Sequence, residues 1–110
     1  MGVAMWADEA SIRARLDAEL ARLLAILRAR SDIEQVWRFG SSLTGPVAST
    51  SDLDLLVVQR TTCDPVERAL ELRRALAPRV AVDLFVVTPD EVAHAGRFIT
   101  EVLTHGRREL

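Results

Sequence analysis

Several residue types are missing or scarce in this 110-residue chain, and each absence excludes a class of chemistry. All fourteen basic residues are arginine, so no lysine is present to contact phosphates in a P-loop or to form a Schiff base. Tyrosine is also absent, which excludes modification of a tyrosine on this chain itself. The single cysteine, Cys63, cannot form an internal disulfide and is typical of a protein from a reducing compartment.

The sequence also lacks long apolar runs and any strong excess of one charge. No run approaches the roughly 20 apolar residues of a membrane span, and residues 1–11 lack a basic segment followed by an apolar one. We therefore expect a soluble, cytoplasmic protein that does not bind membranes. The net charge is −2, from sixteen acidic and fourteen basic residues, so we expect no stable binding to duplex nucleic acid.

The length of the chain and the lack of a visible linker or repeat predict one domain, residues 1–110, and hydrophobic periodicity predicts that it begins with a helix. In residues 8–30 apolar side chains recur at three- and four-residue steps, with arginines and acidic residues between them. These apolar residues are Ile12, Leu16, Leu20, Leu23, Leu24 and Leu27. The pattern is typical of an amphipathic helix that covers another layer.

Three short runs rich in Val, Leu and aromatic residues predict strands at residues 33–39, 53–58 and 80–87. Cap and proline signals predict helices from Asp64 to about Ala77 and from Thr88 to about Thr104, with Gly106 as the C-cap. The order predicts an α/β fold in which helices cover a small sheet. The pattern leaves the strand directions open.

Two aspartates, Asp52 and Asp54, stand where the second apolar run begins. Alternate strand residues share a face, so the two carboxylates point the same way, with Cα atoms roughly 6.5 Å apart. Asp83 lies in the next apolar strand, where an ionised carboxylate needs a partner or a proton. If the two strands are adjacent, three carboxylates gather and repel one another unless a metal neutralises them. Such an all-oxygen cluster suits Mg²⁺ or Mn²⁺.

A glycine- and serine-rich segment, residues 40–45, follows the first predicted strand. Its backbone N–H groups and hydroxyls are suited to phosphate oxygens, and a magnesium site of one or two carboxylates implies a phosphate ligand nearby. The glycine spacing matches the start of a P-loop. However, Pro46 stands where that motif requires a lysine, so the segment does not predict a P-loop ATPase.

Gly40-Ser41, ten further residues, Asp52-x-Asp54 and the later Asp83 together resemble the DNA-polymerase-β-like nucleotidyltransferase superfamily. The short chain is more narrowly similar to the minimal nucleotidyltransferases (MNT domains), which are often paired with HEPN proteins in toxin–antitoxin systems. The resemblance implies the nucleotidyltransferase fold, with a small mixed sheet covered by helices. It runs from about residue 36 to residue 87, and the terminal segment 97–110 is also similar.

The resemblance implies Mg²⁺-dependent transfer of NMP, AMP from ATP in the first instance, to a hydroxyl acceptor. Asp52 and Asp54 are then expected to hold both metals and Asp83 the metal on the acceptor side. Gly40, Ser41 and Ser42 are expected to bind the nucleotide phosphates. By the same analogy the acceptor is a tyrosine of a HEPN toxin and this protein is the antitoxin; a homodimer is a further expectation from so small a fold.

Other interpretations remain open from sequence alone. Asp52 and Asp54 also fit a turn that caps a strand, and Asp83 a buried acid paired with Arg38. Many minimal members carry an arginine in the loop, whereas this chain reads Ser42-Leu43-Thr44-Gly45. That departure motivates a different class of function, a binding module with weak or no catalysis that neutralises a partner by occlusion. Small-molecule modification of the aminoglycoside kind is disfavoured because the chain leaves little room for a second substrate-binding domain.

Overall fold

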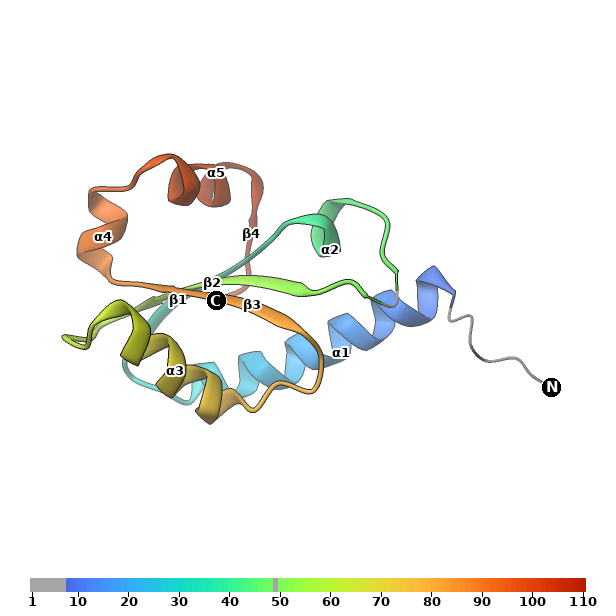
Figure 1. Cartoon of the computed structure of the whole chain (residues 1–110), viewed down its shortest axis with the longest axis horizontal. Helices are drawn as coiled ribbons and strands as arrows, with labels where there is room; N and C mark the ends of the chain where they lie inside the picture. Colours follow the sequence, from blue (N-terminus) through green and yellow to red (C-terminus); the bar gives the residue numbers. More distant parts are fainter. Residues whose placement is uncertain (1–7, 49) are drawn as a thin grey trace.

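The computed structural model describes residues 8–48 and 50–110, and its helices and strands alternate along the chain except where α4 is followed directly by α5 (Figure 1). In chain order they are α1 (Glu9–Arg28), β1 (Ile33–Phe39), α2 (Ser41–Thr44), β2 (Leu53–Gln59), α3 (Pro65–Leu76), β3 (Val82–Val87), α4 (Pro89–Ala93), α5 (Arg97–His105) and β4 (Arg107–Arg108).

Each of the two long helices begins at an aspartate whose side chain caps its first turn, and the cap at Asp64 is the one that the sequence predicts. The side chain of Asp8 accepts a hydrogen bond from the backbone N–H of Ser11 and caps α1. Asp64 accepts hydrogen bonds from the N–H groups of Val66 and Glu67 at the start of α3, where Pro65 occupies the first helical turn. These side-chain acceptors satisfy backbone donors that have no partner within the helix.

The four strands form one mixed sheet with the order β3-β2-β1-β4. β1 is antiparallel to both β2 and β4, whereas β2 and β3 are parallel. The connection from β2 to β3 runs through α3, as a parallel pair requires a crossover. The predicted α/β fold with a small mixed sheet is therefore confirmed, and the strand directions that the pattern left open are settled.

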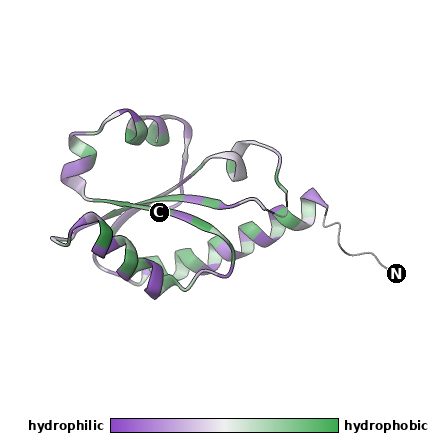
Figure 2. Ribbon diagram, in the orientation of Figure 1, coloured by the Kyte–Doolittle hydropathy of each residue, from purple (hydrophilic) through white to green (hydrophobic). Residues whose placement is uncertain are grey.

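Helices lie on both sides of the sheet, and they cover its two faces unequally (Figures 1 and 2). α1 and α3 lie on one side and pack their leucines against alternate residues of the central strands, including Leu53, Leu55 and Val57 of β2. The short helices α4 and α5 lie on the other side. We call the first side the core face and the second the site face.

The C-terminal third differs from the sequence prediction. Instead of one helix from Thr88 to Thr104, the chain forms α4, capped by Thr88 and Glu91, and a separate α5. His94 leaves the helical conformation and ends α4, and Gly96, with an extended backbone, is the N-cap residue from which α5 begins. Gly106 does follow the last helix, as predicted, and the next two residues form β4 beside β1.

Among residues 8–48 and 50–110, no helix combines the length and the apolarity that a bilayer crossing requires.

Candidate active site

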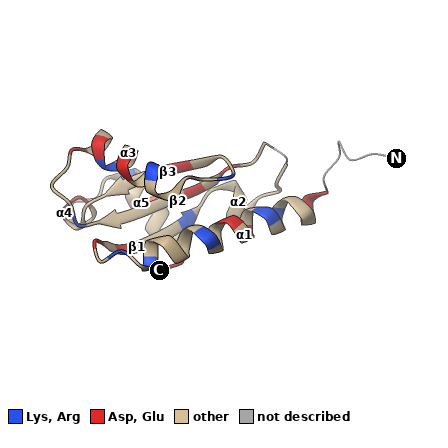
Figure 3. Ribbon diagram, turned by 90° about the horizontal axis from the view of Figure 1, so that it is seen from below, with Lys and Arg blue, Asp and Glu red and all other residues tan. Residues whose placement is uncertain are grey.

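The sheet register brings Asp54 and Asp83 side by side. Their Cα atoms are direct partners in the parallel pairing of β2 with β3. Because residues at matched register share a face, both carboxylates lie on the site face, away from α1 and α3. Figure 3 shows the acidic positions of β2 and β3 next to each other in the sheet. The condition under which the sequence predicted a cluster, adjacency of the two strands, is met.

The electrostatics of this pair are unfavourable when both groups are ionised. The pKa of Asp54 is raised from 3.8 to about 6, first because burial removes water from its carboxylate. Repulsion by Asp83, a hydrogen bond shared with Asp83 and repulsion by Asp52 raise this pKa further. The two carboxylates therefore share a site that favours either a proton or a cation.

No positive side chain relieves that repulsion in the part of the chain that the structure describes. Asp52, Asp54 and Asp83 form no ion pair with an arginine or histidine among these residues. The alternative in which Arg38 neutralises Asp83 is wrong, because Arg38 pairs with Asp17 at 2.8 Å. Asp83 is also exposed rather than buried, since β3 is an edge strand.

Asp52 lies near the pair without closing a three-carboxylate cage. It precedes β2 by one residue and acts on Asp54 through its charge. Within residues 8–48 and 50–110, no three or more acidic, histidine or cysteine side chains are grouped closely enough to hold a metal ion on their own. The structure thus brings two of the three predicted aspartates together and leaves the third alongside.

Gly40 connects the carboxylates to the glycine-serine loop. Its φ of 80° lies in the left-handed region that favours glycine. A Cβ at this position would lie 3.0 Å from Cγ of Asp54 and closer still to its Oδ2. Only glycine lets the backbone pass so close to that carboxylate. The loop and the Asp52-x-Asp54 motif are therefore in direct contact through Gly40 and Asp54.

The two serines after Gly40 have different surroundings. Ser41 is exposed, at the start of the short helix α2. Ser42 is fully buried, and its hydroxyl has no hydrogen-bond partner among the described residues. In this conformation the hydroxyl of Ser41 is accessible to a ligand, whereas that of Ser42 is not.

Two arginine side chains donate hydrogen bonds to backbone carbonyl oxygens of the loop. The sequence analysis predicted neither contact. Arg38 donates to the carbonyl oxygen of Ser42 at 2.9 Å. Arg13 of α1 donates to the carbonyl oxygens of Ser42 and Gly45 at 3.0 and 2.8 Å. The 29-residue separation between Arg13 and Ser42 leaves no local signal of this contact. Both guanidinium groups thereby fix the backbone of the loop.

Arg60, the other arginine close to these strands in sequence, serves a different region. Its guanidinium pairs with the carboxylate of Glu34 at 2.9 Å. Arg60 follows the last residue of β2, whereas Asp54 lies near the first. Neither Arg38 nor Arg60 therefore presents a free guanidinium at the loop in place of the arginine that the family pattern carries.

Three phenylalanines pack together beside the carboxylates on the site face. The ring of Phe39 lies 5.9 Å from that of Phe85 and 5.6 Å from that of Phe98, and the last two are 4.9 Å apart. Phe39 is the Cα partner of Asp54 across β1 and β2. Phe85 and Phe98 remain 41% and 45% exposed, so this cluster is only partly covered.

Comparisons with known proteins concern the family and the fold of this chain. The family model of the nucleotidyltransferase domain matches residues 20–77. A proposed minimal nucleotidyltransferase of known structure is 31% identical, with a TM-score of 0.51, and the match covers 92% of this chain and 95% of that one. No curated protein matches the sequence.

Two further solved structures share the fold. A proposed nucleotidyltransferase from Sulfolobus solfataricus is 22% identical, with a TM-score of 0.64 and 86% of each chain covered. A toxin–antitoxin protein solved with AMP-PNP is 25% identical, with a TM-score of 0.53, and the match covers 80% of this chain and 69% of that one. From the family model and the 31% identical relative, this chain belongs to the nucleotidyltransferase domain family.

Proposed function

We propose that this protein transfers a nucleoside monophosphate, AMP from ATP, to a hydroxyl group of a partner protein. The observation that carries the proposal is the parallel register that sets Asp54 against Asp83, with the backbone of Gly40 packed on Asp54. The carboxylate pair and the backbone of Gly40 then lie together on the sheet face that α1 and α3 leave free. Membership of the nucleotidyltransferase family supports this use of the site.

The chemistry of the donor set fits a hard divalent cation. Asp54 and Asp83 supply carboxylate oxygens without an arginine between them, and Asp52 adds charge beside them. Mg²⁺ commonly binds one or two carboxylates together with substrate phosphates, and Mn²⁺ accepts the same ligands. We propose that these three aspartates hold the metal with the nucleotide. A cation bound there would supply charge neutralisation for the triphosphate and for the acceptor oxygen.

Residues of the chain also bind the phosphates, support the loop and accept the proton of the acceptor. Gly40 and Ser41 present backbone and hydroxyl to the phosphates, and the arginines beneath the loop keep its shape. The acceptor oxygen forms a bond to the α-phosphorus, the bond from that phosphorus to the bridging oxygen breaks, and pyrophosphate leaves. The proton of the acceptor hydroxyl passes to the carboxylate of Asp83, which the open edge of β3 leaves accessible.

The partner is proposed by similarity. One solved structure that shares this fold is a toxin–antitoxin protein with AMP-PNP. We propose a HEPN-type toxin as partner, a tyrosine on it as acceptor, and an antitoxin role in the cytoplasm for this chain. The absence of tyrosine from the chain itself is consistent with an acceptor supplied in trans.

The test is label transfer from α-labelled ATP to the product of the adjacent gene in the presence of Mg²⁺. The wild type is expected to label that protein, whereas Asp52→Asn, Asp54→Asn and Asp83→Asn each lower the rate by at least about 100-fold. Glu67→Gln, an exposed carboxylate change on α3, is the matched control and keeps the wild-type rate. Transfer that survives the combined Asp52→Asn and Asp54→Asn change would overturn the site.

A second candidate, neutralisation of the partner by occlusion without transfer, is favoured by one observation. The arginines nearest the loop donate to backbone carbonyls or to acids elsewhere, so they offer little charge to a triphosphate. Suppression of partner toxicity by Asp54→Asn separates the two. Full suppression supports occlusion, and lost suppression with intact binding supports transfer.

A further inference from the structure

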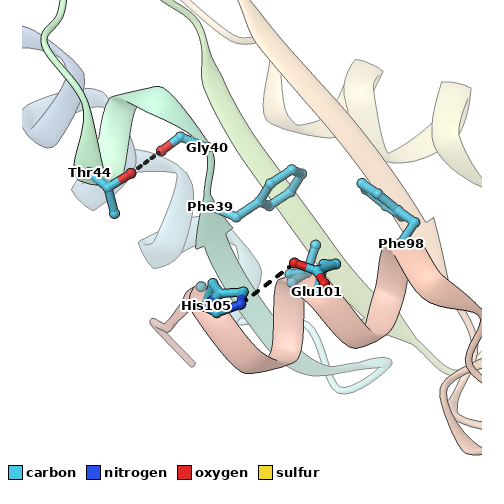
Figure 4. Close-up of a pocket in the computed structure, with 8 residues that line it drawn as sticks. Phe39, Gly40, Thr44, Phe98, Glu101 and His105 are labelled. Carbon is cyan, nitrogen blue, oxygen red and sulfur yellow. Dashed lines mark hydrogen bonds and ion pairs between the residues drawn. The ribbon is translucent and has the colours of Figure 1, made fainter.

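A pocket opens between α5 and the glycine-serine loop, next to the carboxylates. Its volume is about 210 Å³. Phe39 and Phe98 form its apolar wall, as the close-up in Figure 4 shows, and α5 contributes the polar side chains of Glu101 and His105. Gly40 and Thr44 of the loop lie on the opposite side. The same residue, Gly40, therefore touches both the pocket and the carboxylate site.

The size and charge of the pocket decide which part of a nucleotide it suits. Ligand pockets for whole small molecules measure roughly 300–1,000 Å³, so this cavity suits one planar group better than a complete nucleotide. The side chain of Glu101 brings a negative charge that repels phosphate. In a nucleotide whose phosphates bind the loop, the base and not a phosphate is therefore expected to lie in the pocket beside Phe39 and Phe98.

The polar residues on α5 add a chemical preference. Glu101 lies 3.6 Å from His105, one helical turn away, and both side chains are mostly exposed at the rim. An ionised carboxylate only accepts hydrogen bonds, so Glu101 matches an amino group on the base and not a carbonyl. Adenine, cytosine and guanine carry such a group, whereas uracil does not.

We infer that this pocket is the nucleobase site of the enzyme, with the ring of Phe98 as the stacking surface, Phe39 as the apolar wall packed edge-on beside it, and Glu101 as the residue that selects bases bearing an amino group. The inference rests on the proposed function, because it needs a triphosphate on the loop. It adds a base-recognition role for α5, a helix outside the residues that the sequence motifs indicated.

Calorimetric titration in Mg²⁺ with three probes tests the inference: ATP, purine riboside triphosphate, which lacks the amino group, and inorganic tripolyphosphate, which lacks the base. Phe98→Leu keeps apolar volume but loses the ring, and is expected to weaken ATP binding about five-fold or more. Phe98→Tyr restores a ring and is expected to restore affinity. Neither change is expected to alter the affinity for tripolyphosphate.

Glu101→Ala tests the choice of base. The wild type is expected to bind ATP about five-fold or more tightly than purine riboside triphosphate, and in Glu101→Ala this difference disappears. Glu67→Gln on α3 is the charge control and keeps the wild-type ratio. His105→Ala shows whether the neighbouring imidazole contributes, and preservation of the ratio assigns the selection to Glu101.

The outcomes separate the inference from the proposed function. If tripolyphosphate binds but Phe98→Leu and Glu101→Ala bind ATP as tightly as the wild type, the nucleobase site is overturned and the phosphate site stands. An equal loss for ATP and tripolyphosphate also overturns it, since the change then acts through the loop. Failure of the wild type to bind either probe would overturn both proposals.

Discussion

The two faces of the sheet are built from the same strands and have opposite properties. On the core face Leu53, Leu55 and Val57 of β2 are completely buried under α1 and α3. On the site face the same strand presents Asp54, whose pKa is raised, and the neighbouring Phe85 is 41% exposed. Strand alternation thus assigns stability to one face and keeps a partly open, electrostatically strained surface on the other.

The largest effect is expected from the core face. Leu55→Ala leaves a cavity beneath the helices and should lower the free energy of unfolding by about 2–5 kcal/mol. Urea denaturation followed by circular dichroism measures it. A loss below 0.5 kcal/mol, the range of a surface change, would contradict the division between the faces.

Gly40→Ala is expected to have the next largest effect on the unfolding free energy, because Gly40 is the loop residue that contacts Asp54 of the acidic pair. The new methyl group would collide with the carboxylate of Asp54, and alanine is strained at a φ of 80°. A cost of about 1–3 kcal/mol in unfolding free energy is expected. Gly96→Ala is the matched control, since a Cβ there meets no atom within 4 Å. Equal costs at both glycines would disprove the close approach.

Asp54→Asn should act in the opposite direction and stabilise the metal-free protein, on the order of 1 kcal/mol at neutral pH after allowance for solvent screening. The folded pKa of about 6 lies above the unfolded value of 3.8, so the folded state keeps this proton longer than the unfolded state. The stability of the wild type relative to Asp54→Asn is therefore expected to fall as pH rises from about 4 to about 6 and then to stay constant.

Thermal or urea unfolding of both proteins across that pH range measures the difference. A difference that is independent of pH, or one that grows in favour of the wild type as pH rises, would show that Asp54 is not destabilised by burial and by its acidic neighbours.

The sequence predicted the individual helices and strands better than it predicted how they are arranged in space. Strand β1 was predicted with the bounds that the structure shows, because a β-branched and aromatic run between Asp32 and Gly40 has clear limits. The periodic leucines of α1 likewise specified its buried side. Strand direction has no such local signal. The adjacency of Asp54 and Asp83 was therefore only conditional until the parallel register was known.

Features that depend on distant contacts were missed. The support of the loop by Arg13 joins the first helix to residues near position 42, and nothing in the spacing of the arginines distinguishes Arg13 from its neighbours. The aromatic cluster depends on Phe98, which reaches Phe39 only because the chain turns between α4 and α5. One continuous helix was predicted there, so this contact could not have been anticipated.

The smallest effect is expected on the outer surface of a covering helix. Val66 is 68% exposed on α3, so Val66→Ser removes little buried area and should change the unfolding free energy by no more than about 0.5 kcal/mol. Measured beside Leu55→Ala, this variant sharpens the comparison, because it removes an apolar side chain from an exposed position and not from the buried face of the sheet. A loss of 2 kcal/mol or more would indicate that this side of α3 is covered in solution.

The most direct test of the central claim is the stabilisation of the protein by Mg²⁺ and ATP together, with unfolding free energies of the wild type, Asp54→Asn and Glu67→Gln as the readout. At ligand concentrations about 100 times the dissociation constant, the wild type and Glu67→Gln should each gain about 2.7 kcal/mol, whereas Asp54→Asn should gain almost nothing. An equal gain in all three proteins would contradict the claim that the acidic pair on the site face holds the metal and its nucleotide.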